Sequence, residues 1–409
     1  MSPRPDPLAV GGTKRAFRRR IGDDERLARL AIRHRLAVGT QALTLADAAA
    51  SVVALHATDP VSVFLQARAR MLESSPAAIE RALYEDRTVL RMMAMRRTLF
   101  LVPLGDVAIV QAAASRAIAA LERKRTIKMF ADGGIGPDPI ALLEGLETIG
   151  LAALRARGEA ATAELTAVDP RLGQTFVLAA GKAYEGTMSV SSKVFFHLAL
   201  DGHSARGRPL GTWIGGQYRW SPIERWLPDR IPDLPVDVAR AALVRRWLAA
   251  FGPGTRDDIK WWTGWTVADV RTALATIGAV EVELDNGAIG YVLADDLEPV
   301  GATAPWVALL PALDATTMGW QARDWYLGQH RAALFDRNGN AGPTIWAAGR
   351  IVGGWAQRRT GEIVTRLLAD VGTEMSRAIE TEAARLQAWI DPTRIGSRFP
   401  TPLETQLRT

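Results

Sequence analysis

The 409-residue chain contains no cysteine, five histidines and only six lysines among its 50 basic residues. The lack of cysteine excludes disulfide bonds, thiolate metal sites and cysteine nucleophiles. The histidines are scattered without the spacing of metal ligands, so the sequence predicts no metal site. The other 44 basic residues are arginines, whose guanidinium groups suit phosphate and guanine contacts, although abundant arginine and alanine also reflect GC-rich coding.

Long apolar runs are missing too. No uninterrupted run approaches a membrane span, and residues 3–7 alternate proline with charged residues where a signal peptide needs an apolar stretch. We therefore expect a cytosolic protein with no membrane partner. Apolar residues make up 48% of the chain, and its length predicts two to four domains with proper cores. A net charge of +6 gives a mild attraction to polyanions, which many proteins without nucleic-acid partners share.

Residues 252–296 are the most informative stretch. Thr255 with Asp258, and Thr266 with Asp269, have the spacing of a helix-capping hydroxyl and an acid three residues later. Gly264 lies between the two helix starts, where the chain must turn sharply. The pattern predicts a helix-turn-helix.

A β-hairpin is predicted directly after it. Residues 280–284 alternate apolar and polar, residues 285–287 form an Asp-Asn-Gly turn, and the chain returns through Ile289 and Tyr291. Together the two patterns predict a winged helix-turn-helix, although an ordinary helical hairpin beside an unrelated β-hairpin also fits. The outer face of the hairpin is acidic, which is unfavourable for reading a DNA groove, and winged helices also bind protein partners.

A similar order precedes it twice. The first stretch predicts helices at 24–37, 44–54, 60–71 and 76–85, then strands Val89–Met95 and Thr98–Val102 around the basic turn Arg96-Arg97. The second predicts helices at about 140–156, 160–167, 172–180 and 191–201, then a glycine-rich extended segment that ends at Pro222. That segment combines arginine with aromatic and amide side chains, which can contact phosphates and bases, although Trp213 and Trp220 fit equally well as packing residues.

The fold class we expect is α+β, mainly α, with three tandem winged helix-turn-helix units and a small C-terminal β-rich domain. The ranges are a flexible basic tail (1–22), unit 1 with the candidate site (23–137), unit 2 (138–235), unit 3 (236–300) and the C-terminal domain (301–409). In the last range we predict strands at 307–311, 344–347, 350–355 and 362–368, a helix at 373–390 and a loop from Asp391.

Three motifs in this order point to a family: Leu-His-Ala-Thr-Asp-Pro at 55–60, Gln-Tyr-Arg-Trp at 217–220 and Gly-Asn-Ala-Gly-Pro-Thr at 339–344. Over roughly residues 25–370 the chain resembles the AlkZ/YcaQ DNA glycosylases, a helix-turn-helix superfamily of winged-helix DNA-binding proteins. The resemblance implies excision of N7-alkylated purines, unhooking of interstrand crosslinks and a concave basic surface around duplex DNA. It implies no metal or nucleotide cofactor. We expect a monomer associated with the nucleoid in the cytoplasm.

The resemblance also implies a site. Characterised family members carry Gln-x-Gln or Gln-x-Asp before the Asp-Pro pair, and these side chains are thought to hold the attacking water. Here His56 takes the place of the first glutamine and Thr58 that of the second polar residue. A neutral imidazole can accept a hydrogen bond from water and a hydroxyl can orient it. Alternatively, His56 bonds a carbonyl, Thr58 helps to cap the next helix, and Asp59 is the N-cap.

The sequence thus predicts a monofunctional DNA glycosylase-like repair protein with His56 and Thr58 as catalytic residues. The predicted DNA-binding residues are Arg96, Arg97, Arg206, Arg208, Trp213, Gln217 and Arg219. A non-catalytic DNA-binding protein, either a regulator or a lesion-recognition scaffold, is the alternative. Winged helices that bind protein partners are a third possibility.

Overall fold

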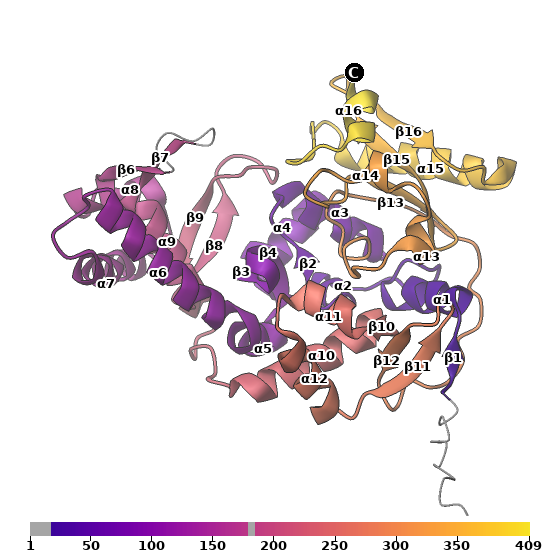
Figure 1. Cartoon of the computed structure of the whole chain (residues 1–409). Coiled ribbons are helices and arrows are strands. Elements are labelled where there is room, and N and C mark those ends of the chain that lie inside the picture. The colour runs from indigo at the N-terminus through magenta and orange to yellow at the C-terminus, as the bar shows by residue number, and fades with distance from the viewer. Residues whose placement is uncertain (1–17, 179–184) are drawn as a thin grey trace, which may run out of the picture.

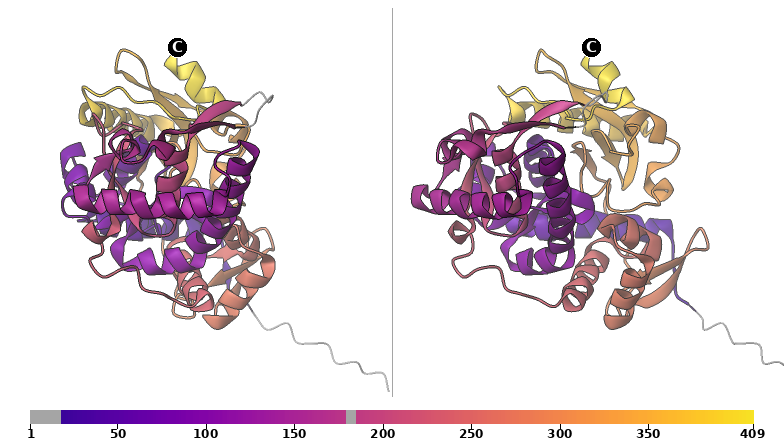
Figure 2. Two further views of the ribbon diagram at one scale, coloured as in Figure 1. Left: turned by 90° about the vertical axis from the view of Figure 1, so that its left-hand side faces the viewer. Right: turned by 60° about the vertical axis from the view of Figure 1, so that its left-hand side comes forward.

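The structure is a computed structural model and describes residues 18–178 and 185–409. Helices alternate with five small sheets in these residues, which makes the fold α+β (Figure 1). Unit 2 lies to one side, the C-terminal domain and unit 3 lie on the other, and unit 1 lies between them (Figures 1 and 2).

One connectivity occurs three times along the chain. A short strand is followed by two helices and a β-hairpin, and the short strand pairs antiparallel with the second hairpin strand. The three sheets have the orders β2-β4-β3 in unit 1, β5-β9-β8 in unit 2 and β11-β12-β10 in unit 3. In unit 2 a 3-10 turn and the β6-β7 hairpin are inserted between the two helices.

Unit 1 follows the predicted helices and strands closely. Asp59 caps its third helix and Pro60 takes the first helical position, where a missing N–H costs nothing. The elements are α1 (Asp23–Arg33), α2 (Leu45–Ala50), β2 (Leu55–His56), α3 (Pro60–Arg70), α4 (Pro76–Tyr84), β3 (Val89–Ala94) and β4 (Thr98–Pro103).

A long helix links units 1 and 2. It runs without a break from Leu104 to Asp132 through α5 (Val107–Val110), a π-helical turn (Gln111–Ser115) and α6 (Arg116–Asp132). By length and composition it is the one helix in the described residues that could cross a membrane. It packs instead against α9 (Val190–Leu200) of unit 2 and α10 (Val236–Phe251) of unit 3, as a core helix does.

Unit 2 differs from the prediction in one element. The predicted helix at 172–180 is wrong: β6 (Thr175–Leu178) is a strand paired with β7 (Gly186–Ser189), and residues 179–180 lie outside the described residues. Phe176 packs against Phe130 there, and an apolar run this short fits either a helix or a strand. The other elements are α7 (Pro139–Arg157), β5 (Ala160–Ala161), α8 (Thr162–Thr166), β8 (Ser204–Pro209) and β9 (Tyr218–Pro222).

Unit 3 has the predicted caps and turn. Thr255 with Asp258, and Thr266 with Asp269, form reciprocal capping boxes, and Gly264 has a φ of 77°, which favours glycine. The elements are β10 (Gly254–Thr255), α11 (Arg256–Thr263), α12 (Val267–Thr276), β11 (Val280–Leu284) and β12 (Ile289–Val292).

The predicted flexible tail is wrong for residues 18–22, while residues 1–17 lie outside the described residues. β1 (Arg20–Ile21) pairs in parallel with β11, and Ile21 is fully buried against Val282, Leu284 and Val292. The sequence offered one large apolar residue here, and its burial becomes clear only once the hairpin edge lies beside it.

The C-terminal domain is built on the sheet β13 (Val307–Leu310), β14 (Thr344–Ala347), β15 (Arg350–Gln357) and β16 (Ile363–Leu367), with the short helices α13 (Asp324–Leu327) and α14 (Arg331–Leu334). α15 (Gly372–Ile390) packs on this sheet through Ile379, Ala383, Leu386 and Ile390. The loop predicted from Asp391 is wrong at its end: α16 (Pro402–Arg408) buries Leu403 and Leu407 against β15.

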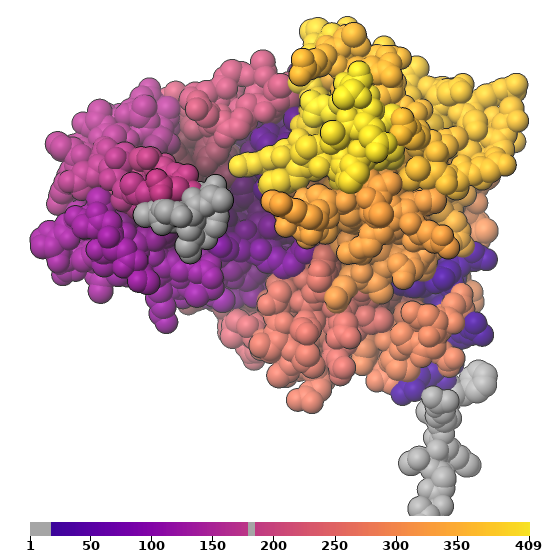
Figure 3. Space-filling view, turned by 45° about the horizontal axis from the view of Figure 1, so that its top comes forward, coloured from indigo at the N-terminus to yellow at the C-terminus, as the bar shows by residue number. Residues whose placement is uncertain are grey.

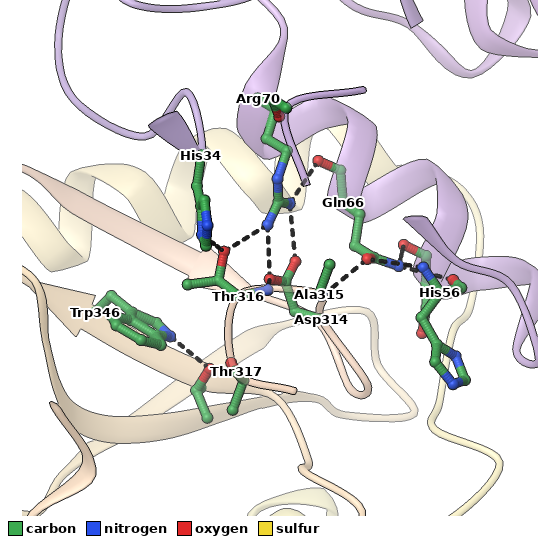
Figure 4. A network of polar contacts seen from close by, with 12 residues as sticks. His34, His56, Gln66, Arg70, Asp314, Ala315, Thr316, Thr317 and Trp346 are labelled. Carbon is green, nitrogen blue, oxygen red and sulfur yellow. Dashed lines mark hydrogen bonds and ion pairs between the residues drawn. The ribbon is translucent and has the colours of Figure 1, made fainter. Parts of the chain in front are cut away.

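The apolar core does not follow the four predicted ranges. One continuous cluster joins unit 1, unit 3 and the C-terminal domain and takes in Ala205, Trp213, Ile223 and Trp226 of unit 2, whereas a second cluster holds the rest of the unit 2 core. A buried polar network crosses the shared core (Figure 4). Arg70 of α3 forms two hydrogen bonds with Asp314, both side chains being 0% exposed, and His34 bridges Thr316 and the Ala250 carbonyl.

Candidate active site and nucleic-acid interface

His56 lies on β2, opposite Phe100 of β4, and its backbone is fixed on both sides. Its N–H donates to Gln66 Oε1 (3.3 Å) and its carbonyl accepts from Gln66 Nε2 (2.8 Å). The same Gln66 Oε1 accepts from Ala315 N (3.1 Å). The amide of one α3 side chain therefore ties the candidate residue to the C-terminal domain (Figure 4).

The His56 imidazole points away from this network (Figure 4). It is 4% exposed and packs edge-on against Phe100, with 5.2 Å between ring centroids. Nδ1 is buried without a hydrogen-bond partner among the described residues. Burial, with a smaller contribution from the positive charge of Arg96, lowers the pKa of His56 to about 3. The ring is therefore neutral at physiological pH, able to exchange hydrogen bonds but weak as a base.

Thr58 and Asp59 follow on the same segment. Thr58 is half-buried and its Oγ1 accepts from Leu99 N (3.3 Å), which leaves the hydroxyl hydrogen free to donate. Asp59 accepts from Val61 N (3.2 Å) as the α3 cap and from Arg398 N (3.4 Å). Burial raises the pKa of Asp59, while these two N–H donors oppose the shift. Asp59 is thus an N-cap, and His56 and Thr58 remain the candidate residues of the site.

A cationic group lies close to His56. Arg96, in the β3-β4 turn with a φ of 53°, places its guanidinium 4.0 Å from the ring centroid of Trp261. Arg323 lies over the same ring at 4.7 Å. Burial and then the like charge of Arg323 lower the pKa of Arg96 to about 10, so it stays protonated at neutral pH. Sequence reasoning missed Trp261 and Arg323, since only the fold brings α11 and the segment before α13 to the β3-β4 turn.

The other predicted DNA-binding arginines divide into two groups. Three form ion pairs: Arg97 with Glu122 (2.9 Å), Arg208 with Glu85 (2.9 Å), and Arg219 with Glu159 and Glu164 (3.0 Å each). Arg206, like Arg96, has no carboxylate within 4.0 Å among residues 18–178 and 185–409, and stacks over Tyr218 at 4.4 Å. The positive charges of Arg96 and Arg206 are therefore available to an anion.

Trp213 and Gln217 differ in their exposure to solvent. Gln217 is exposed on the loop between β8 and β9, where a ligand can reach it. Trp213 is only 8% exposed and packs against Phe64 (4.7 Å) and Trp389 (6.1 Å), so the prediction that it contacts DNA is wrong. Its indole packs between α3 and α15, because burying a large aromatic ring there is more favourable than leaving it exposed to solvent.

Two further arginines missed by the sequence lie near the site. Arg91 of β3 has its Nε and Nη2 buried without a hydrogen-bond partner in the described chain, and it lines one small cavity with Arg206. Arg398 lies in the C-terminal domain, before α16, and its backbone N–H donates to Asp59 Oδ2. The molecular surface is hollowed between unit 2 and the C-terminal domain, with unit 1 at the floor of the hollow (Figure 3).

The family model described as DNA glycosylase AlkZ-like matches residues 49–389. The chain belongs to the AlkZ-like DNA glycosylase family. A solved structure, the DNA glycosylase AlkZ of Streptomyces sahachiroi, has the same fold, with a TM-score of 0.65 and 18% sequence identity over 89% of this chain and 96% of that chain. No match was found among curated protein sequences. His56, Thr58 and Arg96 lie inside the family match, whereas Arg398 lies outside it.

Proposed function

We propose that this family member is a monofunctional DNA glycosylase that hydrolyses the N-glycosidic bond of N7-alkylated purines, including those in interstrand crosslinks. Three winged-helix units would hold duplex DNA across the hollow of Figure 3, with the protein acting as a monomer at the cytoplasmic nucleoid. The observation that carries the proposal is the buried, neutral His56 with an unused Nδ1, on β2 inside the family match. A buried polar atom without a partner calls for a physical explanation, and a hydrogen bond to a bound water is one.

The chemistry requires little from the protein. An N7-alkylguanine is already cationic, so when the bond from C1′ to N9 breaks, the electron pair leaves with the base and neutralises it. Water oxygen then bonds to C1′, and the proton that it loses passes to bulk solvent. His56 would accept a hydrogen bond from this water and Thr58 would donate one, so the two position the nucleophile. The unpaired charges around the site favour the phosphates that flank the sugar.

A protein that binds lesions without cleaving them is the second candidate. It is favoured by the weak basicity of His56, whose pKa is lowered to about 3, and by the absence of the family's glutamine. The decisive experiment uses a duplex with one N7-methylguanine and measures free base, alkali-labile sites and binding between about 50 and 200 mM salt. Base release supports the glycosylase. Binding without release supports the scaffold, and loss of salt dependence would exclude both.

A further inference from the structure

Residues 394–400, directly before α16, form a segment that reaches the candidate site at Asp59 and that we call the strap. Three of its backbone N–H groups donate to side chains: Ile395 N to Gln357 Oε1 (2.7 Å), Ser397 N to Glu404 Oε1 (3.1 Å) and Arg398 N to Asp59 Oδ2 (3.4 Å). The strap is therefore held by β15, α16 and the cap of α3 at successive points. It holds the Arg398 backbone against Asp59, which lies three positions after His56 in the sequence.

Arg398 itself is exposed, and the C-terminal segment, yellow in Figure 3, projects over the hollow toward unit 2. Arg91 of unit 1 and Arg206 of unit 2 line one small cavity. Burial lowers the pKa of Arg206, Tyr218 opposes the shift, and the charges of Arg91 and Arg398 lower the pKa further. The positive charges of Arg91, at the cavity, and of Arg398, on the strap, therefore both act on Arg206.

These three arginines have no ion pair within the described part of the chain, whereas arginines elsewhere on unit 2, such as Arg155, Arg219 and Arg225, are paired with glutamates. Like charges held together by a fixed backbone raise the energy of the free protein unless an anion joins them. Guanidinium matches a phosphate with paired hydrogen bonds, and three of them around one group fix its position.

We propose that Arg91, Arg206 and Arg398 form a clamp for one backbone phosphate of duplex DNA, and that the strap, which the family match does not cover, completes it. The inference rests on the proposed function. Arg398 is a positioning residue in this scheme: it holds the strand beside His56 and does not touch the reacting atoms. The clamp would set the position of the lesion nucleotide relative to the water held by His56 and Thr58.

The test compares Arg398→Ala with Arg377→Ala in the full chain. Arg377 is exposed on α15, on the side of the C-terminal domain away from unit 2, and its loss changes the net charge equally (Figure 1). Affinity for a lesion duplex is measured from about 50 to 200 mM salt, with melting temperatures as a folding check. Arg398→Ala should weaken binding about tenfold and reduce the slope of log affinity against log salt by about 0.9, the value for one lost phosphate contact, whereas Arg377→Ala should leave the slope unchanged.

A second series locates the phosphate. Single methylphosphonates replace the phosphates around the lesion one by one. At one position the wild type should lose affinity and Arg398→Ala should lose none, because its contact to that phosphate is already absent. If Arg398→Ala loses as much affinity as the wild type at every position, the clamp is overturned even if the wild type binds and excises. If the wild type itself shows no salt-dependent binding, the proposed function and the clamp fail together. Arg398→Lys should recover part of the slope, since it restores the charge without the paired geometry.

Discussion

The β3-β4 hairpin of unit 1 and the β11-β12 hairpin of unit 3 occupy the same place in the same connectivity, yet their turns carry opposite charges. Asp285 in the unit 3 turn accepts from Asp23 N (2.7 Å) and Arg20 Nε (3.1 Å), so its charge is used inside the protein. Arg96 in the unit 1 turn lies over the Trp261 ring and has no carboxylate within 4.0 Å in the described chain. The hairpin whose charge remains unpaired is the one beside His56.

The comparison explains why an acidic hairpin is compatible with a DNA-binding family. Its acidic side faces the basic residues Arg18 and Arg20 at the start of the described chain, and Arg18 is paired with Glu281. Unit 3 therefore uses its hairpin to bind the chain's own N-terminal strand, and under the proposed function the hairpin that faces DNA is that of unit 1. Shared topology indicates a common scaffold, and the pairing of charges indicates which copy meets the ligand.

The largest expected effect is on base release, through His56 beside the unit 1 hairpin. His56→Ala should lower base release by about 100-fold or more, the usual contribution of a group that positions water, and should change DNA affinity less than twofold. His56→Gln restores an amide that can exchange the same hydrogen bonds and should keep most of the activity. Release of free base from N7-methylguanine duplex under single-turnover conditions measures both. Full activity in His56→Ala would remove this residue from the site.

The next effect belongs to unit 3. Ile21→Ala removes a fully buried side chain from the small cluster under β11 and should lower the free energy of unfolding by about 2 kcal/mol. Urea unfolding measures the loss. Arg20→Ala, which removes an exposed ion pair on the same strand, is the matched control and should cost less than about 1 kcal/mol. An unchanged midpoint in Ile21→Ala would show that β1 is not part of the fold.

Much of the fold could be predicted because its signals are local. Capping pairs at Thr255 and Thr266, the Asp59-Pro60 start of α3 and the Asp-Asn-Gly turn each depend on residues within a few positions. Long-range pairing could not be predicted in this way. β1 depends on β11, some 260 positions later, and the α16 helix depends on β15.

The site was predictable to the same extent. His56 and Thr58 came from a motif position, but the partners that tune them come from distant segments: Arg323 through Trp261, Ala315 through Gln66, and Arg398 through Asp59. Arg208, Arg219 and Trp213 show the opposite limit. Their residue types favour DNA contacts, and only the fold shows two of them paired with glutamates and the third in the core.

Acid should affect the surroundings of the two hairpins in different pH ranges. Burial lowers the pKa of His56 to about 3 and that of His197 to about 4, and that of His34 well below its usual value. Below about pH 6.5 the histidines of the unfolded chain are protonated, whereas the folded histidines, with their lowered pKa values, stay neutral. The free energy of unfolding therefore falls as pH drops from about 6.5 toward those values, and these histidines do not change it above pH 6.5. The limit is about 1.4 kcal/mol per pH unit for each histidine.

The unit 3 turn should respond later. Hydrogen bonds, first that from Asp23 N, lower the pKa of Asp285, so its contribution is present above about pH 4 and is lost only as pH falls through the lowered value. Urea midpoints at pH 7.5, 6 and 5 follow the histidines against an opposite contribution from Glu147, whose pKa burial raises to about 7, and the His197→Gln variant separates the two. His197→Gln should reduce the fall between pH 6 and 5, whereas Asp285→Asn should leave it unchanged. Equal slopes in wild type and His197→Gln would contradict the assignment.

The smallest effect compares neighbours within one turn. Arg96 and Arg97 both have positive φ, but Arg97 pairs with Glu122 and Arg96 has no carboxylate within 4.0 Å in the described chain. Arg96→Gln keeps a polar side chain in the turn and removes the charge, so it should weaken duplex binding about fivefold, as expected for one partly screened phosphate contact. Arg97→Gln should weaken it less than twofold, because its charge is already matched. Salt titrations of both variants check this, and a larger loss in Arg97→Gln would mean that ion pairing does not decide which arginines meet DNA.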